Sequence, residues 1–190
     1  MLNSLVGIIA SSGGAAAGTA YESIASATGT GSSDTITFSS IPSTYTSLQI
    51  RFIGRTTASD VPANLHIRLN GDTGSNYAQH QLSGDGTTVT ASGLATQTRI
   101  RGGAISTAAE TAGIMGVNII DIHDYASTTR NKTIRIFSGV DKNGAGGFVE
   151  LGSGLWASTS AVNSVSLFTT VTGGSWSTNS TFALYGIKGA

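Results

Sequence analysis

Apolar and polar positions alternate along several short segments of the chain. In residues 48–52, Leu, Ile and Phe alternate with Gln and Arg, and residues 65–69 and 165–169 repeat the pattern. A period of two places one set of side chains on each face of an extended strand. The pattern therefore predicts an all-β chain.

Residues that favour tight turns separate twelve such segments. Pro, Gly, Asn and Asp occupy the gaps, as in 41–43 and 141–144, and Asn70-Gly71 is typical of a hairpin. Residues 105–112 are the one stretch with helical composition, and glycines flank them on both sides. The predicted strands are residues 34–38, 47–53, 64–70, 77–82, 87–91, 95–101, 114–122, 131–138, 147–151, 154–157, 163–171 and 181–187.

This spacing predicts one domain over residues 21–190, an antiparallel two-sheet sandwich of the jelly-roll type. The strand order stays open at this point. Apolar residues on one face of each strand should form the core between the sheets. The expected core residues are Leu48, Ile50, Phe52, Leu65, Ile67, Leu69, Val117, Ile119, Ile134, Ile136, Val165, Leu167, Phe182 and Leu184.

Residues 1–20 predict an extended N-terminal arm. Small residues in 11–18 form a tether, and the residues before it are either a disordered terminus or an apolar peg that docks on a partner subunit. We favour the peg, because leaving aliphatic side chains in water is unfavourable. The apolar run is too short to span a bilayer, and no Lys or Arg precedes it as in a secretion signal. The residues of the peg are Leu2, Leu5, Val6, Ile8 and Ile9.

Composition narrows the function classes. The ten basic and ten acidic residues balance, so no basic field exists to bind nucleic acid. Gly, Ser and Thr occur 26 times each and Cys is absent, which removes disulfides and thiolate chemistry. Near-zero net charge suits a subunit whose surface is covered in an assembly.

Candidate catalytic and metal sites are weak. Asp121 and His123 share one face of a strand, but no third ligand is spaced near them. No G-x-S-x-G nucleophile motif occurs, and the three glutamates stand in unrelated contexts. The loop 141–144 begins like a calcium loop, yet position 152, the twelfth from Asp141, is Gly where such a loop uses Glu. The loop 70–76 is also rich in oxygen ligands, but an Asn-Gly hairpin explains most of its composition. We therefore expect no enzyme activity, no metal and no cofactor.

Aromatic rings offer a surface for glycans, because sugar faces stack on them. Trp156 follows Leu155 in an apolar run and is expected in the core, whereas Trp176 lies in the polar loop 174–179 and is expected to be exposed. Tyr45 and Tyr125 are undecided between core and surface. The predicted surface contacts to a ligand or a neighbouring subunit are Trp176, Asn179, Tyr77 and Asn76.

Six blocks of turn and strand-end residues stand out: 38–45, 68–77, 119–122 with 124–125, 131–133, 153–156 and 182–189. Together they resemble β-sandwich virion proteins of tailed phages, particularly marine and cyanobacterial ones. The resemblance extends over residues 21–190 and does not include the arm. It rests on turns and strand ends, which identify a family better than a role.

The resemblance implies a non-enzymatic structural protein on the exterior of a phage particle, assembled as a trimer. The expected role is a tail-fibre or adhesin subunit, held to other virion proteins by the arm and facing a host surface glycan with its far loops. The alternative is a capsid decoration (cement) protein that stabilises the head. A glycan-degrading enzyme is a more distant third possibility.

Overall fold

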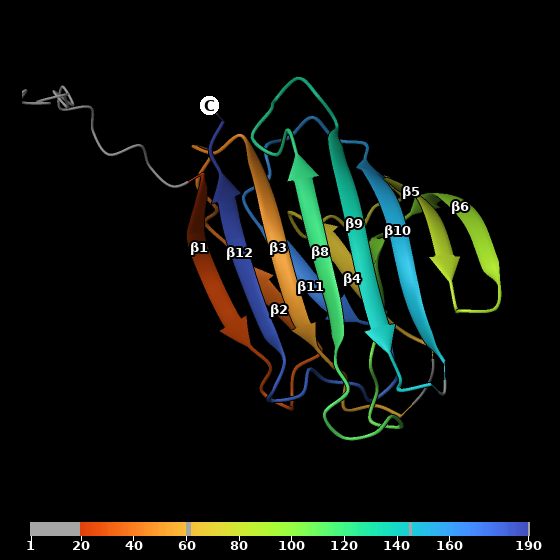
Figure 1. The fold of residues 1–190 in the computed structure, drawn as a ribbon. Helices are drawn as coiled ribbons and strands as arrows, with labels where there is room; N and C mark the ends of the chain where they lie inside the picture. Colours follow the sequence, from red (N-terminus) through yellow and green to blue (C-terminus); the bar gives the residue numbers. More distant parts are fainter. Residues whose placement is uncertain (1–19, 60–61, 145, 190) are drawn as a thin grey trace, which may run out of the picture.

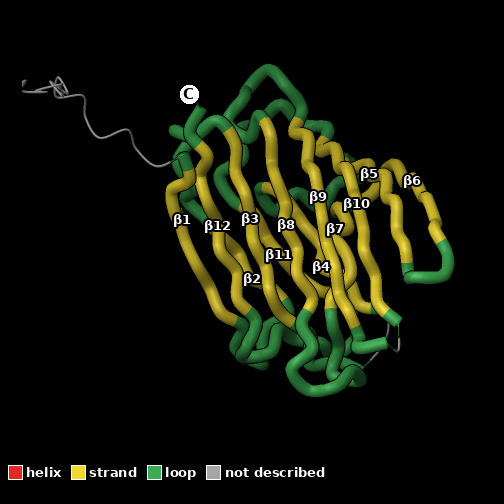
Figure 2. The backbone as a smooth tube through the Cα atoms, in the orientation of Figure 1, coloured by secondary structure: helices red, strands yellow, loops and turns green. Residues whose placement is uncertain are grey.

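Two antiparallel β-sheets pack face to face in this protein (Figures 1 and 2). The computed structural model describes residues 20–59, 62–144 and 146–189, and none of these residues lies in a helix. The large sheet has the order β1 (Tyr21–Thr28), β12 (Thr181–Ile187), β3 (Ser47–Gly54), β8 (Gly116–His123), β9 (Lys132–Asp141), β10 (Gly147–Trp156), β5 (Tyr77–Gly84) and β6 (Val89–Gln97). The small sheet has the order β2 (Thr35–Phe38), β11 (Val165–Thr169), β4 (Ala63–Leu69) and β7 (Ile100–Ile105).

The all-β, two-sheet antiparallel sandwich predicted from the sequence is confirmed, whereas this strand order does not confirm a jelly roll. Aliphatic and aromatic side chains fill the space between the sheets. The expected core residues that are buried there are Leu48, Ile50, Phe52, Leu65, Ile67, Leu69, Ile134, Ile136, Val165, Leu167, Phe182 and Leu184.

The prediction was wrong for two core residues on β8, Val117 and Ile119, which are exposed on the outer face. Ile120 pairs directly with Ile50 on β3 and with Ile136 on β9. Directly paired residues share a face of the sheet, so Ile120 points inward and its neighbours along the strand point outward. Alternation could not choose between the faces, because both faces of this strand carry aliphatic residues.

Several strands differ from the predicted ones. The predicted segments 87–91 and 95–101 are replaced by β6 over Val89–Gln97 and β7 over Ile100–Ile105. β1 is not predicted, because Ser and Ala dominate it, yet it pairs with β12 at the edge of the large sheet. The two predicted segments 147–151 and 154–157 form the single strand β10. A Cβ atom at Gly154 would lie 2.7 Å from Cδ1 of Ile100. Glycine at this position therefore marks close packing between the sheets, not a turn.

Residues 105–112, the one stretch with helical composition, end β7 and then form turns, and one predicted local structure differs. Asn70 and Gly71 have φ angles of 50° and 65°, as in a type I′ turn. The hairpin expected there is wrong, because the loop carries the chain from β4 in the small sheet to β5 in the large one.

Candidate functional site

The outer face of the large sheet carries apolar residues across five neighbouring strands, β8, β9, β10, β5 and β6. Directly paired residues form two adjacent rows on this face, and neither row contains a polar side chain. We call these positions the apolar band. Its first row is Val117, Gly139, Val149, Gly84 and Val89, and its second row is Ile119, Phe137, Leu151, Leu82 and Ala91.

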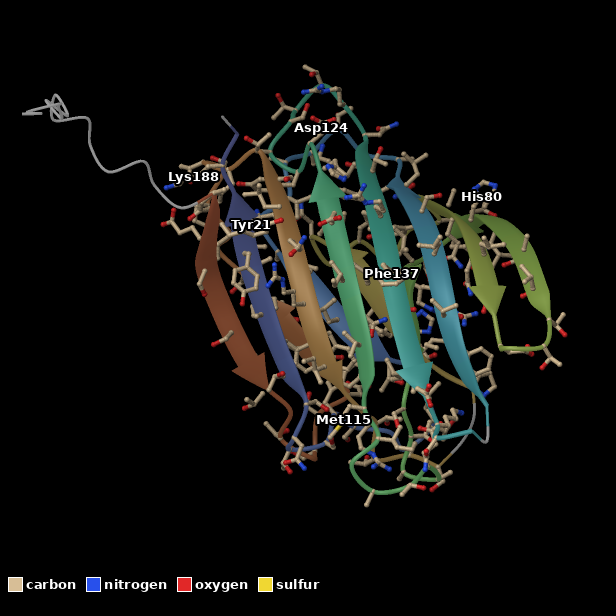
Figure 3. All side chains as sticks on the ribbon, in the orientation of Figure 1. Tyr21, His80, Met115, Asp124, Phe137 and Lys188 are labelled. Atoms are coloured by element: carbon tan, nitrogen blue, oxygen red, sulfur yellow. The ribbon has the colours of Figure 1, made fainter. Side chains whose placement is uncertain are left out.

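The side chains of the band are open to solvent. Phe137 is 50% exposed, Leu151 is 54% exposed and Val89 is 72% exposed. Figure 3 labels Phe137 on β9, near the middle of the outer face. Ile53 continues the first row onto β3 and is also exposed. A continuous apolar patch on a soluble protein is often functional, so the band is a candidate site of interaction.

The first row alternates valine with glycine. A Cβ atom at Gly139 would meet only the carbonyl oxygen of Phe148, at 3.7 Å, and one at Gly84 would meet only Cγ1 of Val149, also at 3.7 Å. Both glycines therefore leave open space between neighbouring valines. Four residues of the first row line a shallow groove at this end of the sheet together with the tip of the β9–β10 hairpin, namely Val117, Gly139, Val149 and Gly84.

Polar residues border the band on the side of the second row. The next row contains Gln49, Asp121 and Arg135. Nη2 of Arg135 donates to Oδ2 of Asp121 at 2.8 Å, and Nε2 of Gln49 donates to Oδ1 at 2.8 Å. Partial burial would raise the pKa of Asp121, but these hydrogen bonds outweigh it and lower the pKa. Both oxygens of Asp121 therefore accept hydrogen bonds from Gln49 and Arg135. Asp121 does not orient the His123 imidazole by a hydrogen bond, as a catalytic base or a metal site requires.

A largely buried ion pair joins the loop before β8 to the β9–β10 hairpin. Nζ of Lys142, in the β9–β10 hairpin, lies 2.6 Å from Oε1 of Glu110 in the loop before β8. Oε2 of Glu110 accepts hydrogen bonds from Oγ of Ser106 and from the backbone N–H of Thr107, the latter at 2.7 Å. This ion pair ties the loop to the hairpin.

β6 forms the edge of the large sheet beyond β5. Residues 89–96 are all exposed, so both faces of this strand meet solvent. β6 contains neither a charged residue nor a proline, which are the features that commonly protect edge strands from pairing with another chain. The edge therefore adds a second surface suited to assembly, continuous with the band.

A buried carboxylate that the sequence did not indicate lies between the sheets. Glu150 on β10 points inward and is 2% exposed. Its Oε1 accepts from Nη2 of Arg101 at 2.6 Å and from Nε2 of Gln81 at 2.8 Å. Its Oε2 accepts from the backbone N–H of Ala104 at 2.6 Å. Because its oxygens are occupied by donors of the protein itself, this glutamate joins β7 to β10 and offers no free base.

Two of the four predicted surface contacts are in the core, so their expected exposure is wrong. Trp176 is fully buried, and its ring centroid lies 5.2 Å from those of Phe52 and Phe182. Tyr77 is buried beside Trp156, which is in the core as expected. The Tyr77 hydroxyl accepts from the backbone N–H of Leu69 at 3.1 Å.

Burial raises the pKa of Tyr77 to about 12 and keeps its hydroxyl protonated. The other two predicted contacts, Asn179 and Asn76, are exposed. Tyr125 is buried and Tyr45 is partly buried. The described loops therefore do not present the rings on which the expected glycan contact depended.

The two oxygen-rich loops, 70–76 and 141–144, use their carboxylates internally. Asp72 accepts hydrogen bonds from the backbone N–H of Gly74, from Nδ2 of Asn76 and from Nε1 of Trp156, the last at 2.7 Å. Oδ1 of Asp141 accepts from the backbone N–H of Asn143. Across the described residues, no group of three or more His, Cys, Asp or Glu side chains could hold a metal ion.

The predicted arm residues Leu2, Leu5, Val6, Ile8 and Ile9 lie outside the described residues. Within the described residues, no helix is long and apolar enough to cross a membrane. Comparisons with protein families, curated proteins and solved structures found no match to the chain.

Proposed function

We propose that the protein is a non-enzymatic structural subunit on the exterior of a phage particle. The observation that supports the proposal most directly is the apolar band, because a surface of this kind is stabilised when another protein covers it. The phage setting comes from the resemblance of the turns and strand ends to virion β-sandwich proteins. Trimeric assembly is part of the same proposal.

The described surface favours packing against neighbouring subunits over contact with a host glycan. Trp176 and Tyr77 are in the core, which weakens the tail-fibre or adhesin role. A capsid decoration protein needs only a covered sheet face and an anchoring arm. We therefore place the decoration role first and keep the tail-fibre role as the second candidate, since it shares the band and the arm.

Labelling intact particles tests this proposal. An epitope tag after residue 190 would follow β12, whose end at Ile187 pairs with the start of β1 and is remote from the band. Gold-labelled antibody should decorate the outside of particles of the phage that encodes the chain, on the head for decoration and on the tail for a fibre. Absence of the tagged chain from purified particles would overturn the proposal.

A turnover assay tests the non-enzymatic part. The purified chain, incubated with host surface polysaccharide, should release no new reducing ends. Release of new reducing ends by the parent chain would overturn the non-enzymatic part of the proposal. If the release also persisted in a Glu150→Gln variant, the catalytic group would lie elsewhere in the chain.

A further inference from the structure

We propose that residues 2–9 of a neighbouring copy of this chain lie across the apolar band. The inference rests on the proposed function only in taking the chain to work in an assembly, and it names the partner in that assembly. The occupant is the apolar peg, Leu2, Leu5, Val6, Ile8 and Ile9, and the receptor is the two rows of the band.

The two surfaces match in chemistry. Residues 2–9 contain five aliphatic residues, and the first charged side chain of the sequence is Glu22. The band likewise has only aliphatic, aromatic and glycine positions. Contact between them would remove apolar surface from water on both sides without burying a charge, which is the favourable case for association.

The two surfaces also match in size. Five strands about 4.8 Å apart and two rows of side chains give a band of roughly 25 by 12 Å, about 300 Å². A stable interface between two folded proteins needs about 800 Å² on each partner, so one arm on one band is a weak contact that gains strength when several copies of it act together in an assembly. Eight extended residues are about 27 Å long and roughly 10 Å wide, which fits the band.

The glycines of the first row leave open space that can accept aliphatic side chains of the peg. Open space above Gly139 separates Val117 from Val149, and open space above Gly84 separates Val149 from Val89. Side chains of the peg can enter these two spaces between the valines. The alternation of valine and glycine thus gives the band a shape that a flat apolar sheet lacks.

A neighbouring copy is favoured as the source of the arm because the proposed function places the chain in an assembly. Tyr21 pairs with Ile187, in line with His123, whereas Thr28 at the other end of β1 lies in line with Val117 and the band. The backbone N–H of Lys188 donates to the carbonyl oxygen of Ala20, which continues the ladder to the end of the sheet. The arm therefore departs from the end opposite to its own band. A tether of ten residues spans up to about 35 Å when extended, which would reach its own band as well as that of a neighbouring copy, so the experiment has to separate the two.

Disulfide cross-linking tests the contact, because the natural chain has no cysteine. Full-length chains carrying Leu5→Cys are mixed with full-length chains carrying Leu151→Cys and oxidised mildly. We expect a covalent product of twice the 19.2 kDa chain mass in which peptide mass spectrometry identifies the 5–151 disulfide, as distinct from 5–5 and 151–151. The matched control is Thr133→Cys, which is exposed on the same face of β9 but outside the band. Its yield with Leu5→Cys should be about tenfold lower.

A single chain that carries both Leu5→Cys and Leu151→Cys separates the two possible sources of the arm. Covalent dimers and larger oligomers support the inference, whereas a monomer with altered mobility would place the arm on its own sheet and overturn it. Equal yields at Leu151 and Thr133, or no cross-link at either position, would overturn it as well.

Gly139→Val provides a second test that does not disturb the fold. The added side chain has open space above β9 and fills the gap between two valines. The yield of the cross-link between positions 5 and 151 should fall about tenfold, and an unchanged yield would contradict the proposed binding position of the peg.

If the cross-link fails while the tagged chain is found on particles, only this inference is lost. If the chain is absent from particles, the proposed function is lost and the cross-link still stands.

Discussion

At the scale of single residues, Glu150 shows how much the sandwich depends on one buried carboxylate. Glu150→Gln removes the charge opposite Arg101, which is itself 29% exposed. Losing one partner of a buried ion pair is strongly destabilising, and the partial exposure of Arg101 reduces the effect. We expect urea unfolding to show a loss of about 2–4 kcal/mol in the free energy of unfolding.

The matched control for this variant is Glu22→Gln. Glu22 pairs with Lys188 on the surface, and both side chains are nearly half exposed. The control should change the free energy of unfolding far less than Glu150→Gln does. Equal losses in the two variants would show that the hydrogen bonds around Glu150 do not stabilise the sandwich.

His66 should make stability depend on pH. Burial away from water, together with the charges of Arg99 and Arg101, lowers its pKa to about 3. The ordinary pKa near 6.5 returns on unfolding, so the unfolded chain binds more protons between these two values. Stability is therefore complete above about pH 6.5 and falls as the pH decreases towards 3.

Urea unfolding at pH 7 and pH 5 measures this dependence. The parent chain should lose about 2 kcal/mol more than His66→Gln between these two pH values. The control is needed because carboxylates with lowered pKa values, such as Asp72, add their own loss of stability at lower pH. An identical loss in both proteins would mean that the folded protein accepts a charged imidazole at this position.

At the scale of elements, β8 offers a comparison between two isoleucines on opposite faces of one strand. Ile120 is fully buried and Ile119 is partly exposed. Ile120→Ala should cost about 2–5 kcal/mol through the cavity it leaves, and Ile119→Ala less than about 1 kcal/mol. Thermal or urea unfolding of the two variants measures both values. The reverse order would show that the faces of β8 have been assigned wrongly.

β8 also shows what the sequence could and could not predict. Alternation with Gln49 and Arg51 assigns the faces of β3 without ambiguity, and Leu48 and Ile50 are buried as predicted. In β8 both faces are aliphatic, so only the pairing with β3 and β9 decides, and pairing between distant segments is not visible in one sequence. The apolar band was hidden for the same reason.

Trp176 was misplaced for a related reason. Its neighbours in sequence are small and polar, which is typical of an exposed loop. Its burial depends on Phe52, far away in the chain, and on Phe182 beyond the loop. Glu150 was equally invisible, since its donors come from three other strands, β5, β7 and β9.

At the scale of the whole molecule, the large sheet has twice as many strands as the small one. Its edge strand β6 and its central strand β9 differ in exposure to solvent. β6 has one neighbouring strand and both faces in solvent, whereas β9 lies between β8 and β10 above the core. Local opening needs less free energy where few buried contacts hold a strand.

Hydrogen exchange of the full chain should therefore be much faster for the amides of β6 than for those of β9. Mass spectrometry of peptides from the two strands measures the difference, with β8 as a second central strand for comparison. Equal protection of β6 and β9 in a dilute sample of monomers would contradict this account of the edge.

The meeting of Ala20 with Lys188 at one end of β1 and β12 has a consequence for engineering. Ala20 and Lys188, which flank the first and last strands of the sandwich, are neighbours, so a short peptide linker could join them. New termini could then be opened at an exposed turn. A circularly permuted form with its new ends at residues 85–87, between β5 and β6, would keep every ladder of the small sheet. Cargo fused there would project from the opposite flank.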